Sequence, residues 1–168
     1  MEKANGGFLF FDEVSDMPTG TQSKILRVLV EQAFTRVNGN NLVRVDLRVI
    51  SSTNKNLISK IASGDFREEL YHRLNVVPIK VPSLENRRED IPILANHFVK
   101  ILNNNEGLPL RTFSDGAITK LQTMSWPGNI RQLRNAVEQI LILGSSNKII
   151  ESTELPESKQ SDKSSNGD

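Results

Sequence analysis

The chain has 168 residues, of which 37% are hydrophobic, and its 21 basic and 20 acidic side chains leave a formal net charge of +1. This composition is typical of one globular domain or pieces of two, and the charge excludes a global field toward nucleic acid or anionic membranes. The absence of cysteine excludes disulfides, thiolate catalysis and cysteine-ligated zinc, and two separated histidines, His72 and His97, do not suggest a metal site. With no long apolar run and no leader-like segment, we expect no membrane partner and a cytoplasmic location.

The first half of the chain alternates between predicted strands and helices. The apolar run at residues 8–11 predicts a strand buried on both faces of a parallel sheet, and apolar spacing then predicts an amphipathic helix through about residue 32. The elements that follow are a hairpin of strands at 34–37 and 42–44 around a Gly/Asn turn, a strand at 45–50, short helices at 56–63 and 67–74, and a strand at 76–81. This alternation favours an α/β fold.

From Asp90 onward the pattern predicts helices only. Asp90 is expected to cap the first, with Pro92 in its first turn, and Ser114 to cap the second. Asn129 is expected to cap the third, which stops at Gly144. The predicted organisation is an α/β part at residues 1–84, a helical subdomain at 85–147 and a disordered tail or linker at 148–168.

Polar residues follow two of the predicted strands at the point where each strand ends. Asp12 and Glu13 come directly after the first strand, and Asn54 follows the strand at 45–50. If these strands are parallel, the residues share the edge where α/β sheets place their ligands. There Asp12 can hold Mg²⁺ through its water shell, Glu13 can deprotonate an attacking water, and Asn54 can bind a phosphate or that water. The alternative is a solvated loop with an ordinary turn asparagine.

Three arginines are candidates for phosphate binding, because the planar guanidinium stays charged and can bind two oxygens. Arg67 and Arg73 flank a short helix and point in different directions, so they are not expected to hold one ligand from the same face. Glu69 lies four residues before Arg73, which predicts a surface salt bridge of about 0.3–0.5 kcal/mol. Arg131 leaves the last helix away from its apolar stripe and reaches either a phosphate or solvent.

The pattern Gly-x-x-x-x-Gly-Lys-Ser/Thr occurs nowhere in the chain. That loop normally supplies the backbone cradle and the lysine that hold the phosphates of ATP. The residues taken by themselves therefore predict half of a nucleotide site.

Four motifs, in their order along the chain, resemble the central ATPase module of the sigma-54-dependent transcription activators, the NtrC class of bacterial enhancer-binding proteins. Residues 2–13 resemble its Walker B segment, 45–57 its sensor I strand, 66–76 its arginine-finger helix and 126–133 its sensor II signature. The resemblance covers residues 2–144. The sequence at 16–18 and 31–34 leans toward NtrX-like response regulators of two-component systems.

The resemblance implies a partial AAA+ P-loop NTPase core, with strands 3, 4 and 5 of a sheet ordered 5-1-4-3-2, followed by an all-α lid. It implies ATP and Mg²⁺ as cofactors, and as partners a homo-oligomeric ring, the sigma-54 RNA polymerase holoenzyme, and DNA through a domain absent here. It assigns a role to each polar candidate: Asp12 to Mg²⁺, Glu13 to water activation, Asn54 to γ-phosphate sensing, Arg67 and Arg73 to the neighbouring subunit's ATP, and Arg131 to the nucleotide in cis.

The chain also departs from the family pattern. Ser51 and Ser52 replace a small apolar pair, Gln132 stands where glutamate is common, and Glu85 stands where the family usually has arginine. In the family, residues like 2–4 lie mid-domain, after the phosphate-binding loop. We therefore expect a gene fragment or a split reading frame whose α/β half is marginal alone and exposes a bare strand edge, with a complete three-helix lid at 90–144.

Three functions are compatible with these residues. The first is part of an ATPase-derived transcription regulator that is inactive alone or depends on a partner for its missing half. The second is a non-catalytic module that enters rings of an intact relative and offers Arg67 and Arg73 in trans. The third, disfavoured by the balanced charge, is a helix-turn-helix DNA reader built from the last two helices.

Overall fold

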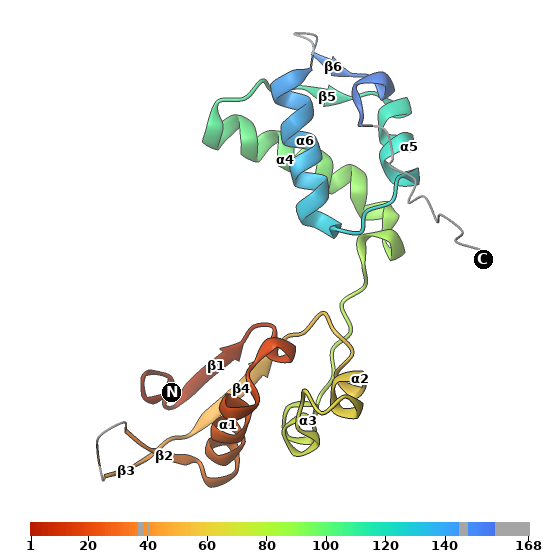
Figure 1. Ribbon diagram of the computed structural model, residues 1–168. Helices are drawn as coiled ribbons and strands as arrows, with labels where there is room; N and C mark the ends of the chain where they lie inside the picture. Colours follow the sequence, from red (N-terminus) through yellow and green to blue (C-terminus); the bar gives the residue numbers. More distant parts are fainter. Residues whose placement is uncertain (37–38, 40, 145–147, 157–168) are drawn as a thin grey trace, which may run out of the picture. The chain divides into compact units, whose positions relative to one another are not determined.

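The computed structural model describes residues 1–36, 39, 41–144 and 148–156 (Figure 1). The chain divides into two compact units, residues 1–79 and 80–168, each considered by itself. The predicted hairpin turn lies largely outside the described residues, at 37, 38 and 40, as does the end of the predicted tail, at 157–168. Within the described part of the chain, no helix is long and apolar enough to cross a membrane.

The first unit is a small α/β arrangement around two parallel strands. Strands β1 (Gly7–Phe11) and β4 (Leu47–Ser51) pair in parallel, with Gly7 opposite Leu47 and Phe11 opposite Ser51. The other elements are η1 (Glu2–Ala4), η2 (Val14–Asp16), α1 (Thr19–Glu31), the antiparallel hairpin of β2 (Ala33–Thr35) and β3 (Leu42–Arg44), α2 (Leu57–Ala62) and α3 (Glu68–Leu74). The predicted order of strands and helices is confirmed as far as α3.

Helix α1 provides much of the core of this unit. Its buried positions, Gln22, Ile25 and Val28, recur every three residues, which is the stripe of an amphipathic helix. Ile25 packs with Val14, Phe66 and Leu70 in one apolar cluster, and Val28 packs with Val45 and Leu47 in a second. The position of Gln22 in this stripe is unusual because its side chain is polar.

The prediction that the first strand is buried on both faces is wrong. Phe8 and Phe10 are 67% and 57% exposed, whereas Leu9 between them packs toward the cluster that contains Val28. Alternate residues of a strand point to opposite faces of a sheet. Nothing in the described part of the chain covers the face that carries Phe8 and Phe10, so only the other face is buried.

The predicted strand at 76–81 is also wrong. This segment forms no ladder with any described residue, and its side chains Val76, Val77, Ile79 and Val81 are strongly exposed. A strand is stable only beside a neighbour that satisfies its backbone groups. The sheet around β1 and β4 offers the segment no such pairing, so an apolar run with strand composition remains without regular structure.

The second unit is helical, and its three predicted helices are confirmed. They are α4 (Ile91–Glu106), α5 (Asp115–Thr123) and α6 (Asn129–Leu143), and α6 lies across α4 (Figure 1). The shorter elements are η3 (Leu84–Asn86), η4 (Arg88–Asp90), the parallel pair β5 (Thr112–Phe113) and β6 (Ile149–Ile150), and η5 (Ser152–Glu154). The three helices bury a single apolar core that includes Trp126.

Only one of the three predicted helix caps forms. The Ser114 hydroxyl accepts a hydrogen bond from the Ala117 backbone N–H at 3.3 Å, as a cap should. Asp90 precedes α4 but makes no side-chain capping bond. Asn129 has a left-handed backbone (φ 52°), and its Oδ1 accepts from the backbone N–H of Leu84 at 2.8 Å instead. A contact between distant segments thus replaces the local cap.

Residues 148–156, predicted as the start of a tail, continue the lid. Ile149 and Ile150 pair with β5, and Ile150 and Leu155 are buried in the core of the unit. The surrounding composition is polar, but two buried apolar side chains and a short strand pairing are enough to hold this segment in place. The apolar core therefore extends beyond the three helices.

Candidate functional site

The carboxyl ends of β1 and β4 bring the acid pair beside the polar residues that follow β4. The Ser52 backbone N–H donates to the Phe11 carbonyl at 2.9 Å, and the Val14 N–H donates to the Ser52 carbonyl at 3.0 Å. These bonds continue the parallel pairing past the ends of both strands. They fix Asp12 and Glu13 against the segment after β4, at the edge where the parallel arrangement places them.

Ser52 holds both acidic residues. Its hydroxyl donates to Asp12 Oδ1 at 2.6 Å and accepts from the backbone N–H of Glu13 at 3.3 Å. A small apolar residue at this position would make neither bond. The departure from the family pattern at Ser52 therefore has a structural role, which is to orient an exposed carboxylate at the edge of the sheet.

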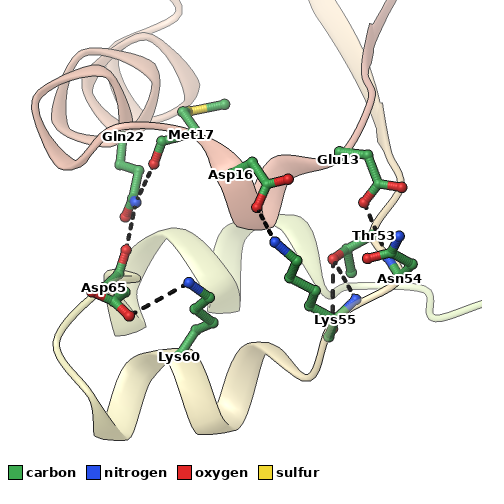
Figure 2. A network of polar contacts seen from close by, with 9 residues as sticks. All are labelled: Glu13, Asp16, Met17, Gln22, Thr53, Asn54, Lys55, Lys60 and Asp65. Carbon is green, nitrogen blue, oxygen red and sulfur yellow. Dashed lines mark hydrogen bonds and ion pairs between the residues drawn. The ribbon is translucent and has the colours of Figure 1, made fainter.

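Glu13 is held in an uncommon conformation. Its backbone is left-handed (φ 50°, ψ 55°), which costs a non-glycine residue about 1–2 kcal/mol. The half-buried side chain turns back toward the segment after β4, where Oε2 accepts from the Asn54 backbone N–H at 3.2 Å (Figure 2). Strain of this kind persists where neighbouring contacts determine it, and it is concentrated at functional sites.

An ion pair lies beside the acid pair. The Lys55 ammonium donates to Asp16 Oδ1, so that η2 is joined to the segment after β4 a second time (Figure 2). This hydrogen bond, with the opposite charge, holds the pKa of the Asp16 carboxyl below its ordinary value and raises the pKa of Lys55. Both side chains are about half exposed, so the pair contributes to orientation more than to stability.

Two candidate arginines lie at opposite ends of α3: Arg67 is its N-cap residue, and Arg73 lies in its last turn. Among the described residues, neither Arg67 nor Arg73 makes a side-chain hydrogen bond or ion pair, and both are exposed. The predicted salt bridge from Glu69 to Arg73 is wrong; the i,i+4 pair on this helix joins Glu68 to His72 at 3.7 Å. An exposed pair gains too little to fix two long side chains, which leaves both guanidinium groups available to a ligand.

One residue that positions this region was not singled out from the sequence. The amide of Gln22 is fully buried, and its Nε2 donates to the carbonyls of Met17 at 2.8 Å and Asp65 at 2.9 Å. Its Oε1 accepts from the Arg67 backbone N–H at 2.9 Å. The available signal was a polar residue in the apolar stripe of α1, three positions before Ile25.

Arg131 belongs to the second unit. It lies exposed in the first turn of α6, and within the described residues its side chain has no hydrogen-bond or ion-pair partner. The structure therefore leaves the guanidinium free for a ligand. The role of Arg131 toward a nucleotide in cis stays a prediction.

Two further departures from the family pattern, Glu85 and Gln132, make contacts inside the lid. Glu85 Oε1 accepts from the Ser125 hydroxyl at 2.6 Å and from the Trp126 backbone N–H at 3.0 Å. These bonds lower the pKa of Glu85. Gln132 Oε1 accepts from the Gly128 N–H at 2.8 Å, which satisfies a donor at the start of α6. Both substitutions thus support the turn that leads into α6.

The edge formed by the acid pair fits Mg²⁺ and the reacting phosphate, but not a whole nucleotide. No described cluster of three or more histidine or acidic residues could enclose a metal. A single carboxylate such as Asp12 suits Mg²⁺, which usually keeps several waters and is bound together with substrate phosphates. The sequence has no loop to cradle the other phosphates. The arrangement therefore corresponds to the part of an ATP site that holds Mg²⁺ and the reacting phosphate, without the part that holds the other phosphates.

Comparison with protein families gives two adjacent matches. Residues 1–80 match the sigma-54 interaction domain, and residues 85–168 match the AAA+ ATPase lid domain. The chain belongs to the sigma-54-dependent transcription activators, as a partial AAA+ core with its helical lid. The predicted family and fold class are confirmed.

Individual relatives support the same placement. The chain is 54% identical over 143 residues to the nitrogen assimilation regulatory protein NtrX of Azorhizobium caulinodans, covering 85% of this chain and 32% of the relative. It is 46% identical over 159 residues to the nitrogen fixation protein VnfA of Azotobacter vinelandii, covering 95% of this chain and 30% of the relative. The crystal structure of NtrX from Brucella abortus in complex with ATP superposes with a TM-score of 0.85 at 51% identity, covering 92% of this chain and 37% of that one. The chain thus spans about a third of the length of these relatives.

Proposed function

We propose that this chain supplies the hydrolytic edge and the trans-acting arginines of a sigma-54-dependent activator of the response-regulator type. In this role, ATP hydrolysis in a homo-oligomeric ring is coupled to remodelling of the sigma-54 RNA polymerase holoenzyme in the cytoplasm, with DNA bound by another domain. The observation that carries the proposal is the acid pair, fixed at the carboxyl end of β1 by Ser52 and by the Asn54 backbone.

Each residue then has a chemical task. Asp12 would hold Mg²⁺ through its water shell, and the metal would neutralise charge on the phosphates. Glu13 would accept the proton of the attacking water; Oε2 is engaged by the Asn54 N–H, which leaves Oε1 for the water. The Asn54 carboxamide would sense the γ-phosphate.

The arginines complete the proposal. Arg67 and Arg73 would stabilise the phosphates bound by the neighbouring subunit, and Arg131 the nucleotide bound by its own subunit. Free guanidinium groups at three exposed positions support these roles, because an arginine already paired to a carboxylate would have to lose that partner first. Their action in trans also explains why Arg67 and Arg73 need not converge on one ligand.

One variant of this function needs no ATP turnover by the chain itself. In this variant the chain would act by entering rings of an intact relative, where it offers Arg67 and Arg73 in trans. A DNA-reading role for α5 and α6 has less support, because the half-buried Arg134 of α6 is paired with Glu106 and Glu138 rather than free for a phosphate backbone.

ATP binding and hydrolysis by the purified chain, alone and mixed with an intact relative of the family, test the proposal. We expect no binding by the chain alone and altered hydrolysis in the mixture. Glu13→Gln removes the proposed base, and Glu31→Gln is a matched control because Glu31 pairs with exposed Arg27 at 2.9 Å, outside the site. Turnover by the chain alone that depends on Glu13 would show that hydrolysis needs no second subunit of an intact relative. An unchanged mixture would refute the trans role.

A further inference from the structure

We infer that Gln22 is a positioning residue for Arg67: its buried amide fixes the backbone from which the guanidinium reaches a neighbouring subunit's phosphate. This inference rests on the proposed trans role of Arg67. It adds a residue on a different helix, α1, whose side chain contacts neither nucleotide nor metal in that proposal.

The hydrogen bonds of Gln22 allow one orientation of its amide. Two donor hydrogens go to the carbonyls of Met17 and Asp65, and the oxygen accepts from the Arg67 N–H. A flipped amide would place its oxygen against two carbonyls and its NH₂ group against an N–H, so that every contact would be lost. Because the side chain is fully buried, water cannot replace these bonds.

The segment held by this amide is the turn that leads into α3. Asp65 and Arg67 are both bonded to Gln22, and Phe66 between them is buried in the core. Asp65 is held further by Lys60 at 3.4 Å (Figure 2). The Ser63 hydroxyl donates to the same carboxylate at 3.0 Å. The backbone is therefore fixed by hydrogen bonds on both sides of Phe66, at Asp65 and at Arg67.

The position of the Arg67 guanidinium depends on this backbone more than on its own contacts. The side chain is exposed and makes no hydrogen bond or ion pair with a described residue, so nothing else in the unit orients it. A misplacement of about 1 Å in a group that acts on a transition state can reduce a rate by about a hundredfold. The buried amide is thus placed to set how well Arg67 reaches its target.

The same amide also connects Arg67 to the subunit's own site. Met17 follows directly after η2, the turn that begins next to Glu13 and contains Asp16. Asp16 is in turn bonded to Lys55 beside Asn54 (Figure 2). Through Gln22, the Met17 segment that follows the subunit's own acid pair is therefore bonded to the backbone of Arg67. Arg67 is the arginine that the subunit would offer to its neighbour.

Two substitutions separate the hydrogen bonds of Gln22. Gln22→Met has a similar length and removes all three bonds. Gln22→Glu, which burial favours in its protonated form, keeps an oxygen that can accept from the Arg67 N–H and an O–H that can donate to one of the two carbonyls. The matched control is Gln122→Met in the second unit, where the Gln122 amide donates to the Arg88 carbonyl at 3.2 Å.

The first readout is hydrogen exchange at the Arg67 amide of the full chain. We expect Gln22→Met to speed this exchange about tenfold or more, because the Arg67 amide loses the one acceptor it has among the described residues, while Gln22→Glu and Gln122→Met stay near the wild type. An unchanged exchange rate in Gln22→Met would overturn the inference.

The second readout is hydrolysis in a mixture with an intact relative in which the arginine equivalent to Arg67 is replaced by alanine. The wild-type chain should raise the rate, and Gln22→Met should lower kcat about tenfold or more toward the level of Arg67→Ala, with the KM for ATP unchanged. Wild-type kcat in Gln22→Met despite faster amide exchange would make the amide purely structural and overturn the inference alone.

The remaining outcomes are also decisive. A wild-type chain that leaves the mixture unchanged refutes the proposed function before any Gln22 variant is compared, and the positioning role falls with it. If Gln22→Met does not fold, Gln22→Glu tests the inference instead. In that variant, slow hydrogen exchange at the Arg67 amide should accompany a wild-type rate of hydrolysis in the mixture. Free exchange at Arg67 with full hydrolysis would overturn the inference.

Discussion

Replacing Glu154 with alanine removes the carboxylate that faces a buried guanidinium in the lid. The side chains of Arg111 and Glu154 are 2% and 18% exposed, and Arg111 Nη2 donates to the two carboxylate oxygens at 2.8 and 2.9 Å. Nη2 also donates to the Ile149 carbonyl at 2.9 Å. Removing one partner of a buried pair costs about 3–5 kcal/mol, because the remaining charge loses the opposite charge that faces it. We expect Glu154→Ala to lose stability on this scale.

Urea unfolding followed by tryptophan fluorescence measures this loss in the lid alone. The chain has one tryptophan, Trp126, and it lies in the core of the second unit. With a slope of about 1–3 kcal/mol per molar urea, the midpoint should fall by roughly 2 M, or the lid should be unfolded without urea.

Two companion variants make this result interpretable. Glu106→Ala removes a partner of Arg134 in a pair whose side chains are both 40% exposed, and it should cost less than about 1 kcal/mol. The double variant Arg111→Met with Glu154→Ala should recover part of the loss, because no buried charge remains. A Glu154→Ala cost as small as that of Glu106→Ala would refute the reasoning.

Two further predictions concern the lid and the α/β unit in turn. Hydrogen bonds from Ser125 and Trp126 lower the pKa of Glu85 below 4.5, so its contribution is present above that pH and is lost as the pH falls through the lowered pKa. The gap in urea midpoint between wild type and Glu85→Gln should therefore close at acidic pH, and a gap independent of pH would contradict this. Leu70→Ala, at a fully buried position of the first unit, should cost that unit about 2–5 kcal/mol by circular dichroism and leave the Trp126 transition in place. A shifted Trp126 transition would argue against separate cores.

Local patterns in the sequence were sufficient for the helices and for the edge of the sheet that carries the acid pair. The apolar run before Asp12 and the polar residues after β4 predicted a shared edge, because parallel strands place their carboxyl ends together. They could not show that Ser52 would hold the acid pair, since a hydroxyl finds its partners only once both strands are paired. The polar position of Gln22 in the apolar stripe of α1 was a signal, but its three partners are backbone groups, which no sequence pattern identifies.

The wrong predictions arose where distant segments decide local structure. Asn129 has the composition of a helix cap, but its amide is used by the Leu84 backbone, 45 positions away in the chain. The segment at 76–81 has the composition of a strand but no neighbour to pair with among the described residues. The composition of a segment indicates which local structure it can form, and its contacts with distant segments determine whether that structure forms.

The bare face of β1 has a consequence for the lifetime of the chain in a cell. Phe8 and Phe10 stand exposed on one side of the sheet, opposite the side that packs in the core. Uncovered aromatic side chains on a sheet favour aggregation, and chaperones and proteases act on proteins whose apolar surface is not buried. A chain with this face covered by a partner would therefore be degraded more slowly than a chain with the face exposed. The abundance of the protein would then depend on the concentration of that partner.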